Sequence, residues 1–580
     1  MNSSFRPYGY KLPVNPQQKQ GSIAQGFVTP KKDRTPQVQC IPPKRVLPIV
    51  FIPGIMGSNL RMNQKRQDKL KQKHNISWRP DNSTVTIQQF DDTPAERQSR
   101  LDPKITEVDI YEPEHNRTGN STETADQRNE AVRYSNGYGG WRRLDGPLLQ
   151  GDLPGSKNGR TQDQKARARG WGEVYFGSYQ SILATCENKL NSAFSGGSLE
   201  RYLGNHIVGV DPSKWQAHPN FSMKPLDENY IREAVKECWF PVHAMGYNWL
   251  KSNRLSGIAI AKRICSLIEN YRKQGFECEK VILVTHSMGG LVARAAIHSG
   301  IGKISDKVLG IVHGVMPAVG AGAAYKRMRC GVEASWYSLP ANIGARVLGN
   351  NGEDVTAVLA GAPGALELLP SRFYGMHWLE LRKGENIVNS WPEKCPYEEI
   401  YKVTGKWYGL FKEEWINPAG LVNAGVSQTL SHLDGARMFH EEIADVYHEN
   451  SYAHYGSDVD RKAWYKVVWR AESSARFKHG DSLRVVNDDR RGELRLVNTA
   501  EKEGTTGGLE FDVEMQAAAE AGDQTVPLHS GDAQLRSGKF KGIFRQSGYE
   551  HQASYDDPAV ISATLYCLFK IISEMKWSKS

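Results

Sequence analysis

The clearest chemical signature in the chain is Ser287, which stands at a predicted turn between a strand and a helix. The apolar, β-branched run at 281–284 is typical of a strand buried on both faces, and 291–297 continues as a helix. A turn this sharp needs small residues two positions before and after the serine; Gly289 meets that need, whereas Thr285 replaces the usual glycine. The pattern predicts a nucleophile elbow, and therefore an enzyme. The alternative is an ordinary turn whose serine only caps the helix.

A serine hydroxyl is a poor nucleophile at neutral pH, so it needs a histidine to take its proton and a carboxylate to orient that histidine. The elbow is typical of the α/β-hydrolase fold, in which the acid and then the histidine follow the serine along the chain. Asp523 lies on a glycine-led loop. His551 lies between a predicted strand at 540–544 and a helix that opens at Asp557-Pro558. We assign Asp523 as the orienting acid and His551 as the general base.

Other histidines and carboxylates compete for these two roles: His286, His298, His313 and His529, and Glu550 and Asp556. His529 follows Asp523 closely, with no strand between them to carry it to the sheet edge. His286 adjoins the nucleophile, and its side chain should point away from it. The other two histidines fit the helix and sheet framework, and both rival acids lie too near His551 in sequence. Residues 515–521 favour a helix, although the fold would place a strand before Asp523.

Two backbone amides are predicted to bind the oxyanion. The amide of Met288 follows the nucleophile and points toward the place where the oxyanion would form. A predicted strand at 45–52 runs into a glycine-containing loop at 53–58, where such enzymes place their second donor. The amide of Ile55 is the candidate, with Met56 as the alternate; a simple Pro-Gly turn is the competing interpretation. This chemistry requires no metal and no organic cofactor, so neither is expected.

The elements that must position these groups alternate between strands and helices. Segments 239–245 and 281–284 have strand character on either side of a helical pattern at 254–271, and another strand is expected at 308–313. A strand–helix–strand unit of this kind implies a parallel sheet. We therefore predict an α/β fold, an α/β-hydrolase with a mostly parallel central sheet. The predicted core comprises 45–60, 170–317 and 515–580.

Three segments lie outside this predicted core. Residues 1–44 are rich in Pro, Gln, Lys and Ser and are expected to form an irregular basic arm. Residues 61–169 are polar and turn-rich, which indicates a surface insertion. Residues 318–514 lack the alternation of strands and helices and are too long for one loop, so we predict a lid or cap insertion. Its apolar cluster at 355–369 could face a membrane or an acyl chain, but the helical spacing favours simple core.

Composition and charge narrow the class of protein. The 580 residues are 39% hydrophobic and 24% charged, which allows a large core and excludes global disorder. The net charge of +10 could attract nucleic acid, an anionic membrane or an acidic carrier. No nucleic-acid motif accompanies the basic residues, so nucleic acid is not an expected partner.

Cysteine spacing and the N-terminal composition bear on the compartment. The eight cysteines have no paired spacing, so neither a zinc site nor a disulfide framework is expected. Residues 1–30 have no apolar stretch of the kind that signal peptides contain, and no segment approaches the length of a bilayer span. We therefore expect the protein to be made in the cytoplasm without a signal peptide.

Several short motifs resemble those of lecithin:cholesterol acyltransferase-like and GPI inositol-deacylase-like α/β-hydrolases. They lie at 53–58, 285–290, 368–371 and 522–527. Two further stretches, Gly-Trp-Gly-Glu-Val at 170–174 and Pro-Val-His-Ala-Met-Gly-Tyr-Asn-Trp at 241–249, resemble the lipase effectors exported by bacterial type VI secretion systems. The sequence departs from the pattern at Thr285 and at Gln524, where glycine is common. Neither departure removes a catalytic group.

The resemblance implies a phospholipase that acts on membrane lipids of a rival cell, in the periplasm of that cell. It also implies delivery through a component of the secretion apparatus and restraint by a cognate immunity protein. In this prediction Ser287 attacks an ester carbonyl, His551 shuttles the proton, and water resolves the acyl-enzyme. Two alternatives stay open: an acyltransferase that shares every catalytic residue, and a non-catalytic binding protein on the same fold. The basic excess suggests anionic phospholipid as the substrate, but much of that excess lies in the N-terminal arm, for which a solvated tail is the preferred interpretation.

Overall fold

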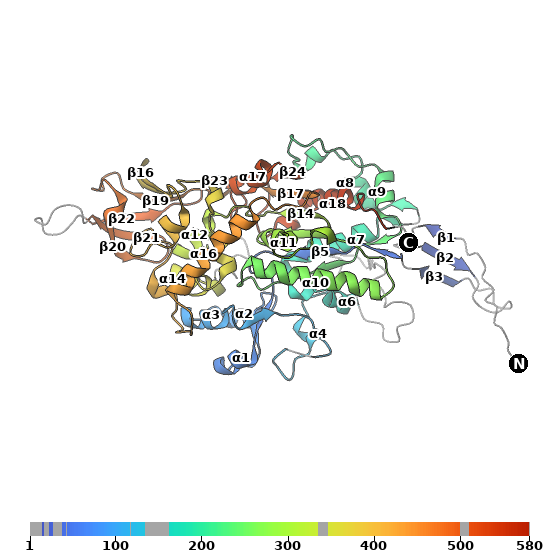
Figure 1. The fold of residues 1–580 in the computed structure, drawn as a ribbon, viewed down its shortest axis with the longest axis horizontal. Helices are drawn as coiled ribbons and strands as arrows, with labels where there is room; N and C mark the ends of the chain where they lie inside the picture. Colours follow the sequence, from blue (N-terminus) through green and yellow to red (C-terminus); the bar gives the residue numbers. More distant parts are fainter. Residues whose placement is uncertain are drawn as a thin grey trace, which may run out of the picture.

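A six-stranded parallel sheet forms the centre of the molecule (Figure 1). Its strands follow one another in the order β12–β5–β13–β14–β17–β24. Its strands are β12 (Val242–Ala244), β5 (Ile49–Ile52), β13 (Val281–His286), β14 (Val308–Gly314), β17 (Ser451–Gly456) and β24 (Phe540–Gln546). All neighbouring pairs are parallel. The predicted α/β class with a parallel central sheet is therefore confirmed.

The computed structural model describes residues 14–16, 22–26, 37–41, 43–115, 118–133, 162–195, 197–333, 346–498 and 510–578. Helices cover both faces of the central sheet (Figure 1). On one face α10 (Asn253–Lys273) and α11 (Gly289–Ile297) pack against Val281 and Leu283; on the other, α7 (Phe176–Asn191) and α18 (Pro558–Ile572) pack against Ile282 and Val284. Burial of alternate side chains on opposite faces explains why the strand before Ser287 is apolar at all four positions 281–284.

Two predicted strands are each broken in two by a proline. The run at 45–52 forms β4 (Arg45–Val46) and β5, and the run at 239–245 forms β11 (Cys238–Trp239) and β12. Pro48 and Pro241 occupy the breaks, because proline has no amide hydrogen to donate to a sheet ladder. The flanking residues keep the register, since β11 pairs with β4 as β12 pairs with β5.

One strand of the central sheet comes from the segment predicted to be a lid insertion. β17 lies between β14 and β24 and is buried along its whole length. The prediction that 318–514 lies wholly outside the core is therefore wrong at Ser451–Gly456. This strand contains serine, histidine and two tyrosines rather than a β-branched run, so its sequence carries no sign of double-sided burial.

The rest of that segment forms a second folded unit at one end of the molecule (Figure 1). Its six-stranded mixed sheet has the order β16–β15–β19–β22–β21–β20. The strands are β16 (Asn386–Trp391), β15 (Leu379–Lys383), β19 (Val467–Ala471), β22 (Glu510–Met515), β21 (Glu493–Asn498) and β20 (Leu483–Asp488), and the main helices are α12 (Gly322–Cys330), α14 (Gly352–Leu359) and α16 (Val426–Ile443). Val355, Val358 and Leu369 are buried, so the interpretation of the 355–369 cluster as core is confirmed there.

The segment before Asp523 is extended rather than helical. β22 ends at Met515, and β23 (Glu520–Gly522) pairs antiparallel with β18 (Asp458–Ala463). The helical prediction for 515–521 is therefore wrong. Alanine and glutamate favour a helix locally, but pairing with β18 and β19 overrides that weak preference.

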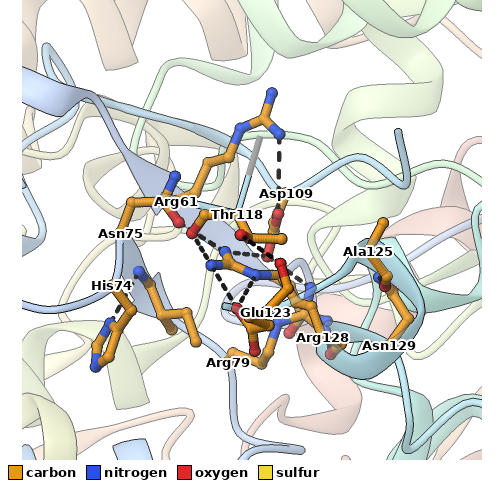
Figure 2. A network of polar contacts seen from close by, with 12 residues as sticks. Arg61, His74, Asn75, Arg79, Asp109, Thr118, Glu123, Ala125, Arg128 and Asn129 are labelled. Atoms are coloured by element: carbon orange, nitrogen blue, oxygen red, sulfur yellow. Dashed lines mark hydrogen bonds and ion pairs between the residues drawn. The ribbon is translucent and has the colours of Figure 1, made fainter. Parts of the chain in front are cut away.

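A cluster of buried charges orders the polar insertion at 61–169. Asp109 accepts from Arg79 at 2.7 Å and from Arg128 at 3.2 Å, and all three side chains are buried (Figure 2). Arg79 also reaches the carbonyl of Gly172 at 3.4 Å, which ties the cluster to the hydrolase core. The insertion further contains β6 (Leu60–Met62), β7 (Ile76–Trp78), β8 (Thr106–Val108), α1 (Gln64–Leu70), α2 (Ser83–Gln88), α3 (Pro94–Arg100), α4 (Ala125–Arg128) and α6 (Gln162–Ala168). The polar insertion is thus partly interior.

The N-terminal arm includes regular structure that was not predicted. β1 (Val14–Pro16), β2 (Ser22–Gly26) and β3 (Gln37–Ile41) form an antiparallel sheet. The expectation of an irregular arm at 1–44 is therefore wrong for these strands. They are short, and only β3 among them alternates polar and apolar residues, over 37–40. Other parts of that arm, up to residue 42, lie outside the described residues. In the described part of the chain, no helix combines the length and the apolar character needed to cross a bilayer.

Candidate active site

Ser287 occupies a strained turn between β13 and α11. Its backbone has φ of 52°, in the left-handed region that residues other than glycine seldom adopt. Met288, not Ser287, is the N-cap of α11, and no side chain caps the helix there. The interpretation of Ser287 as a helix cap is therefore excluded. A serine held in this strained turn is the geometry of a nucleophile elbow.

Close packing explains the glycine that follows the serine. A Cβ atom on Gly289 would lie 2.4 Å from the carbonyl oxygen of Ile52 and 2.5 Å from that of Pro53. No other residue fits there without moving the backbone of the neighbouring strand. Thr285, on the other side of the elbow, is not crowded in this way. Its side chain is buried near His313, and its carbonyl accepts from the Tyr555 hydroxyl at 2.9 Å.

His551 lies between the other two predicted residues. Its Nε2 is 2.8 Å from the Ser287 hydroxyl, and its Nδ1 is 2.8 Å from Oδ2 of Asp523. Asp523 is fully buried, and its other carboxylate oxygen accepts from the amides of Val526 at 2.7 Å and Thr525 at 3.1 Å. A carboxylate held in this way fixes the imidazole with Nδ1 protonated, so that Nε2 is free to accept the serine proton.

Three of the rival residues have hydrogen-bond partners away from Ser287. His529, in α17 (Leu528–Arg536), bonds through Nε2 to the carbonyl of Tyr374 at 2.6 Å. His298 accepts from the amide of Gly300 at 2.8 Å. Asp556 accepts from the Ser181 hydroxyl at 2.5 Å. None of these three has a hydrogen bond to Ser287 among the described residues. His313 lies within β14, where its side chain is buried and its Nδ1 is 3.5 Å from the Thr285 hydroxyl.

His286 and Tyr179 form a hydrogen-bonded support that the sequence did not indicate. The Nε2 atom of His286 lies 2.9 Å from the carbonyl oxygen of His551, and its Nδ1 lies 3.2 Å from the Tyr179 hydroxyl. Burial lowers the pKa of His286 to about 3, so the ring is neutral. Nε2 therefore donates to the carbonyl, and Nδ1 accepts from the tyrosine. Tyr179 lies in α7, soon after the stretch at 170–174. Its closeness to that stretch is the only feature of the sequence that could have pointed to a role for Tyr179 in the site.

The loop after β5 lies against the nucleophile. A Cβ atom on Gly54 would be 3.0 Å from Cβ of Ser287 and 2.8 Å from Nδ1 of His286. The amide of Gly54 donates to the Tyr179 hydroxyl at 3.2 Å. Among the described residues, no acceptor is recorded for the amide of Ile55 or for that of Met288. Both amides are thus available as donors beside Ser287, and their assignment to an oxyanion hole stays a prediction.

A cavity of about 440 Å³ opens over Ser287 and His551. Much of its wall is apolar and comes from the second folded unit. The apolar residues include Met328, Leu348, Leu359 and Leu368. Two members of the 355–369 cluster, Leu359 and Leu368, thus face this cavity as well as the core. The charged residues Arg327 and Lys462 also line it. Such a cavity suits a substrate with both an apolar chain and a polar group near the reacting bond.

Comparison with known proteins finds a family model that matches part of the chain and a solved structure that is similar over most of it. Residues 212–332, which include Ser287, match the family model of a PGAP1-like alpha/beta domain. A solved structure titled "The crystal structure of Tle4-Tli4 complex" is 30% identical in sequence, with a TM-score of 0.68; the match covers 92% of this chain and 99% of that chain. None of the curated proteins compared with the chain matches it. The likeness to the solved structure thus spans nearly the whole of both chains.

Proposed function

This chain belongs to the Tle4 family of α/β-hydrolases, and on that premise we propose that it is a serine lipolytic hydrolase, a phospholipase that cleaves acyl esters of membrane lipids. The observation that carries the proposal is the position of His551, 2.8 Å from both Ser287 and Asp523 in an apolar-walled cavity. Acyl transfer from an ester needs these three groups at these distances, together with room for an acyl chain.

In the proposed reaction, the oxygen of Ser287 attacks the ester carbonyl carbon while Nε2 of His551 takes the hydroxyl proton. The amides of Met288 and Ile55 stabilise the resulting oxyanion. His551 then returns the proton to the departing alcohol, and the acyl group remains on Ser287. Water, deprotonated by the same histidine, attacks the acyl-enzyme; the histidine then returns that proton to the oxygen of Ser287 as the bond to the acyl group breaks and the fatty acid leaves. Asp523 holds His551 in the required tautomer throughout.

Fatty-acid release from mixed phospholipid vesicles tests the reaction and the nucleophile together. We expect Ser287→Ala to lower the rate by a factor of at least about 10³, because a triad acts as a unit. Ser213→Ala, which removes an exposed hydroxyl elsewhere, is the matched control and should keep full activity. Equal release by the wild type and Ser287→Ala would refute the proposed nucleophile. Acyl products that appear only when a lipid alcohol is added would instead identify an acyltransferase.

We further propose delivery into the periplasm of a target cell through a secretion apparatus, with a cognate immunity protein as the restraining partner. The similarity to Tle4, which was solved in complex with Tli4, supports this proposal. Expression of the chain in bacteria with an added export signal should arrest growth, whereas cytoplasmic expression should not. Ser287→Ala in the periplasm is the control. Growth arrest by that variant would mean that toxicity does not depend on hydrolysis.

A further inference from the structure

Two cationic side chains flank the loop that carries Asp523, and the reaction described above uses neither. Arg327, in α12, donates from Nη2 to the Thr525 hydroxyl at 3.1 Å. The backbone amide of Thr525 in turn donates a hydrogen bond to the carboxylate of Asp523. Lys462 approaches from β18 and, like Arg327, lines the catalytic cavity. Two separate elements therefore bring positive charge to one end of this cavity.

β18 is held directly against the loop that follows Asp523. The amide of Gln524 donates to the carbonyl of Arg461 at 3.2 Å, and Ala463 pairs with Glu520 of β23. Lys462 lies between these two anchored positions, so its backbone is fixed beside the loop. The neighbouring Arg461 is already paired with Asp458 at 2.8 Å, which leaves Lys462 as the cation that β18 contributes to the cavity.

The charged side chains around this end of the cavity differ in whether they are paired with one another. Glu333 lies 2.9 Å from Arg327 and 2.7 Å from Lys326. Burial opposes the ionisation of Glu333, but these two cations outweigh it and lower its pKa to about 2. Glu550 and Asp523 itself are the other carboxylates that line the cavity. Arg327 and Lys462 thus share the cavity wall with three carboxylates, Glu333, Glu550 and Asp523. Glu333 is paired with Arg327 and Lys326, and Asp523 is bonded to His551, whereas the described residues offer the Lys462 ammonium no recorded partner.

The opposite character of the remaining wall gives the cavity two chemically distinct parts. Met328, Leu348 and Leu359 offer an acyl chain an apolar surface, and the ester carbonyl of a substrate must lie beside Ser287. In a glycerophospholipid the phosphodiester is only a few bonds from the acyl ester. It would therefore lie in the same cavity as the ester. Arginine and lysine are the side chains that bind phosphate oxygens best, through charge-assisted hydrogen bonds.

We propose that Arg327 and Lys462 form a subsite for the phosphodiester of a glycerophospholipid headgroup. This inference rests on the proposed lipolytic function and names its substrate class. Arg327 supplies a planar guanidinium beside the Asp523 loop, and Lys462 supplies a point charge from the facing strand. Together they would select phospholipids over neutral acylglycerols that carry the same acyl chains.

The test compares two substrates in the same neutral detergent micelles: a phosphatidylglycerol and a diacylglycerol with identical acyl chains. We expect Arg327→Gln and Lys462→Gln each to lower the ratio of kcat/KM for phosphatidylglycerol over diacylglycerol by about tenfold, mainly through KM. Lys478→Gln, which removes an exposed lysine that does not line the cavity, is the matched control for the change in net charge. An unchanged ratio in both cavity variants would overturn the subsite.

Because Arg327 also contacts Thr525, its loss could weaken the triad itself. In that case activity would fall equally on both substrates and the ratio would not change, which counts against the subsite. Binding of the short-chain lipid dihexanoyl-phosphatidylglycerol to the Ser287→Ala protein, measured by calorimetry, needs no turnover. We expect Lys462→Gln in that background to weaken binding about tenfold. Undiminished binding would overturn the subsite, even if the wild type hydrolyses both substrates.

Inorganic phosphate separates a headgroup site from a general anion site. Micellar phosphatidylglycerol hydrolysis that resists millimolar phosphate would agree with a subsite that requires the attached lipid. Strong inhibition by phosphate in the wild type but not in Lys462→Gln would place free phosphate on the same two side chains. A wild type that cleaves neither substrate yet binds dihexanoyl-phosphatidylglycerol through Lys462 would remove the proposed hydrolysis and keep the subsite.

Discussion

His286 donates from Nε2 to the main-chain carbonyl of His551 across 2.9 Å. The other ring nitrogen reaches Tyr179, whose hydroxyl accepts from the amide of Gly54. A continuous path of hydrogen bonds therefore joins the loop after β5 to the loop that carries His551. His286, the residue before the nucleophile, thus holds His551, the proposed general base. The contact is with the backbone of His551 and not with its ring.

Loss of the Tyr179 hydroxyl should slow the reaction more than it weakens substrate binding. Tyr179→Phe leaves the amide of Gly54 without an acceptor and Nδ1 of His286 without a donor, both in a buried place. We expect kcat to fall about tenfold with little change in KM, because both loops position reacting groups. Tyr202→Phe, which removes a hydroxyl bonded to Ser562 at 3.2 Å, is the control. An unaltered kcat in Tyr179→Phe would show that the path does not position these loops.

We expect Gln524, which stands where glycine is common, to change the stability of the protein little compared with glycine. Gln524 has φ of 71°, so its side chain strains the backbone by about 1 kcal/mol. Gln524→Gly would relieve that strain, but it would also lose a similar amount through the added freedom of the unfolded chain. We expect the melting temperature to change little. Gln524→Val should be destabilising by about 1–2 kcal/mol, since a β-branched residue tolerates this conformation poorly. Equal stability of the two variants would contradict this account.

The buried charges of the insertion should make stability sensitive to Asp109. Burial opposes its ionisation, but the charges of Arg79 and Arg128 outweigh that effect and hold the pKa of Asp109 below its ordinary value. Asp109→Asn leaves two buried guanidinium groups without their carboxylate, so we expect a loss of about 3–5 kcal/mol of unfolding free energy. Urea denaturation at pH 7 measures it. Asp512→Asn, which breaks an exposed pair with Arg495, should change stability much less.

The direction of the pKa shift of Asp109 determines how its contribution to stability depends on pH. The pKa of Asp109 is lowered in the folded state, so its stabilising effect is present above the ordinary carboxyl pKa of about 4. It is lost as the pH falls through the lower, folded-state value. The difference in stability between the wild type and Asp109→Asn should therefore shrink below about pH 4. A difference that stays constant down to pH 2 would mean that Asp109 does not titrate in this cluster.

Glu367 should make the protein less stable in mild alkali. Burial raises the pKa of Glu367 to about 8, and its Oε2 accepts from the amide of Asn253 at 2.7 Å. The folded state thus favours the protonated carboxyl; this contribution is complete below the unfolded-state pKa of about 4.5 and is lost as the pH rises through about 8. Glu367→Gln keeps an acceptor for Asn253 but does not titrate. We expect the variant to gain stability relative to the wild type as the pH increases.

Urea unfolding at pH 5 and pH 9 measures this change. The gain should amount to a few kcal/mol, at about 1.4 kcal/mol for each unit of pKa shift. Glu233→Gln, which removes an exposed carboxylate, is the control and should give the same difference from the wild type at both pH values. Parallel curves for Glu367→Gln and the wild type would show that the carboxyl is not held protonated in the fold.

Local patterns in the sequence determined much of the fold and pointed to three residues of the candidate site. The apolar run before Ser287, the small residue at Gly289 and the Asp-Pro that opens α18 are short-range signals, because a turn or a helix start depends on the residues within it. The structure brings Ser287, Asp523 and His551 within hydrogen-bond distance. Their catalytic roles, with those of Met288 and Ile55, stay predictions until the Ser287→Ala comparison is made.

The remaining contacts of the site depend on packing between segments that are far apart in the sequence. Tyr179 and His286 are separated by 107 positions along the chain, and β17 has no strand-like pattern of its own but pairs between two strong strands. Arg327 meets Thr525 across 198 positions. No local preference specifies such contacts, because they depend on the path of the backbone between the partners. The spacing of apolar residues in the sequence indicates which segments become strands and helices. Packing decides which of their side chains come to share one cavity.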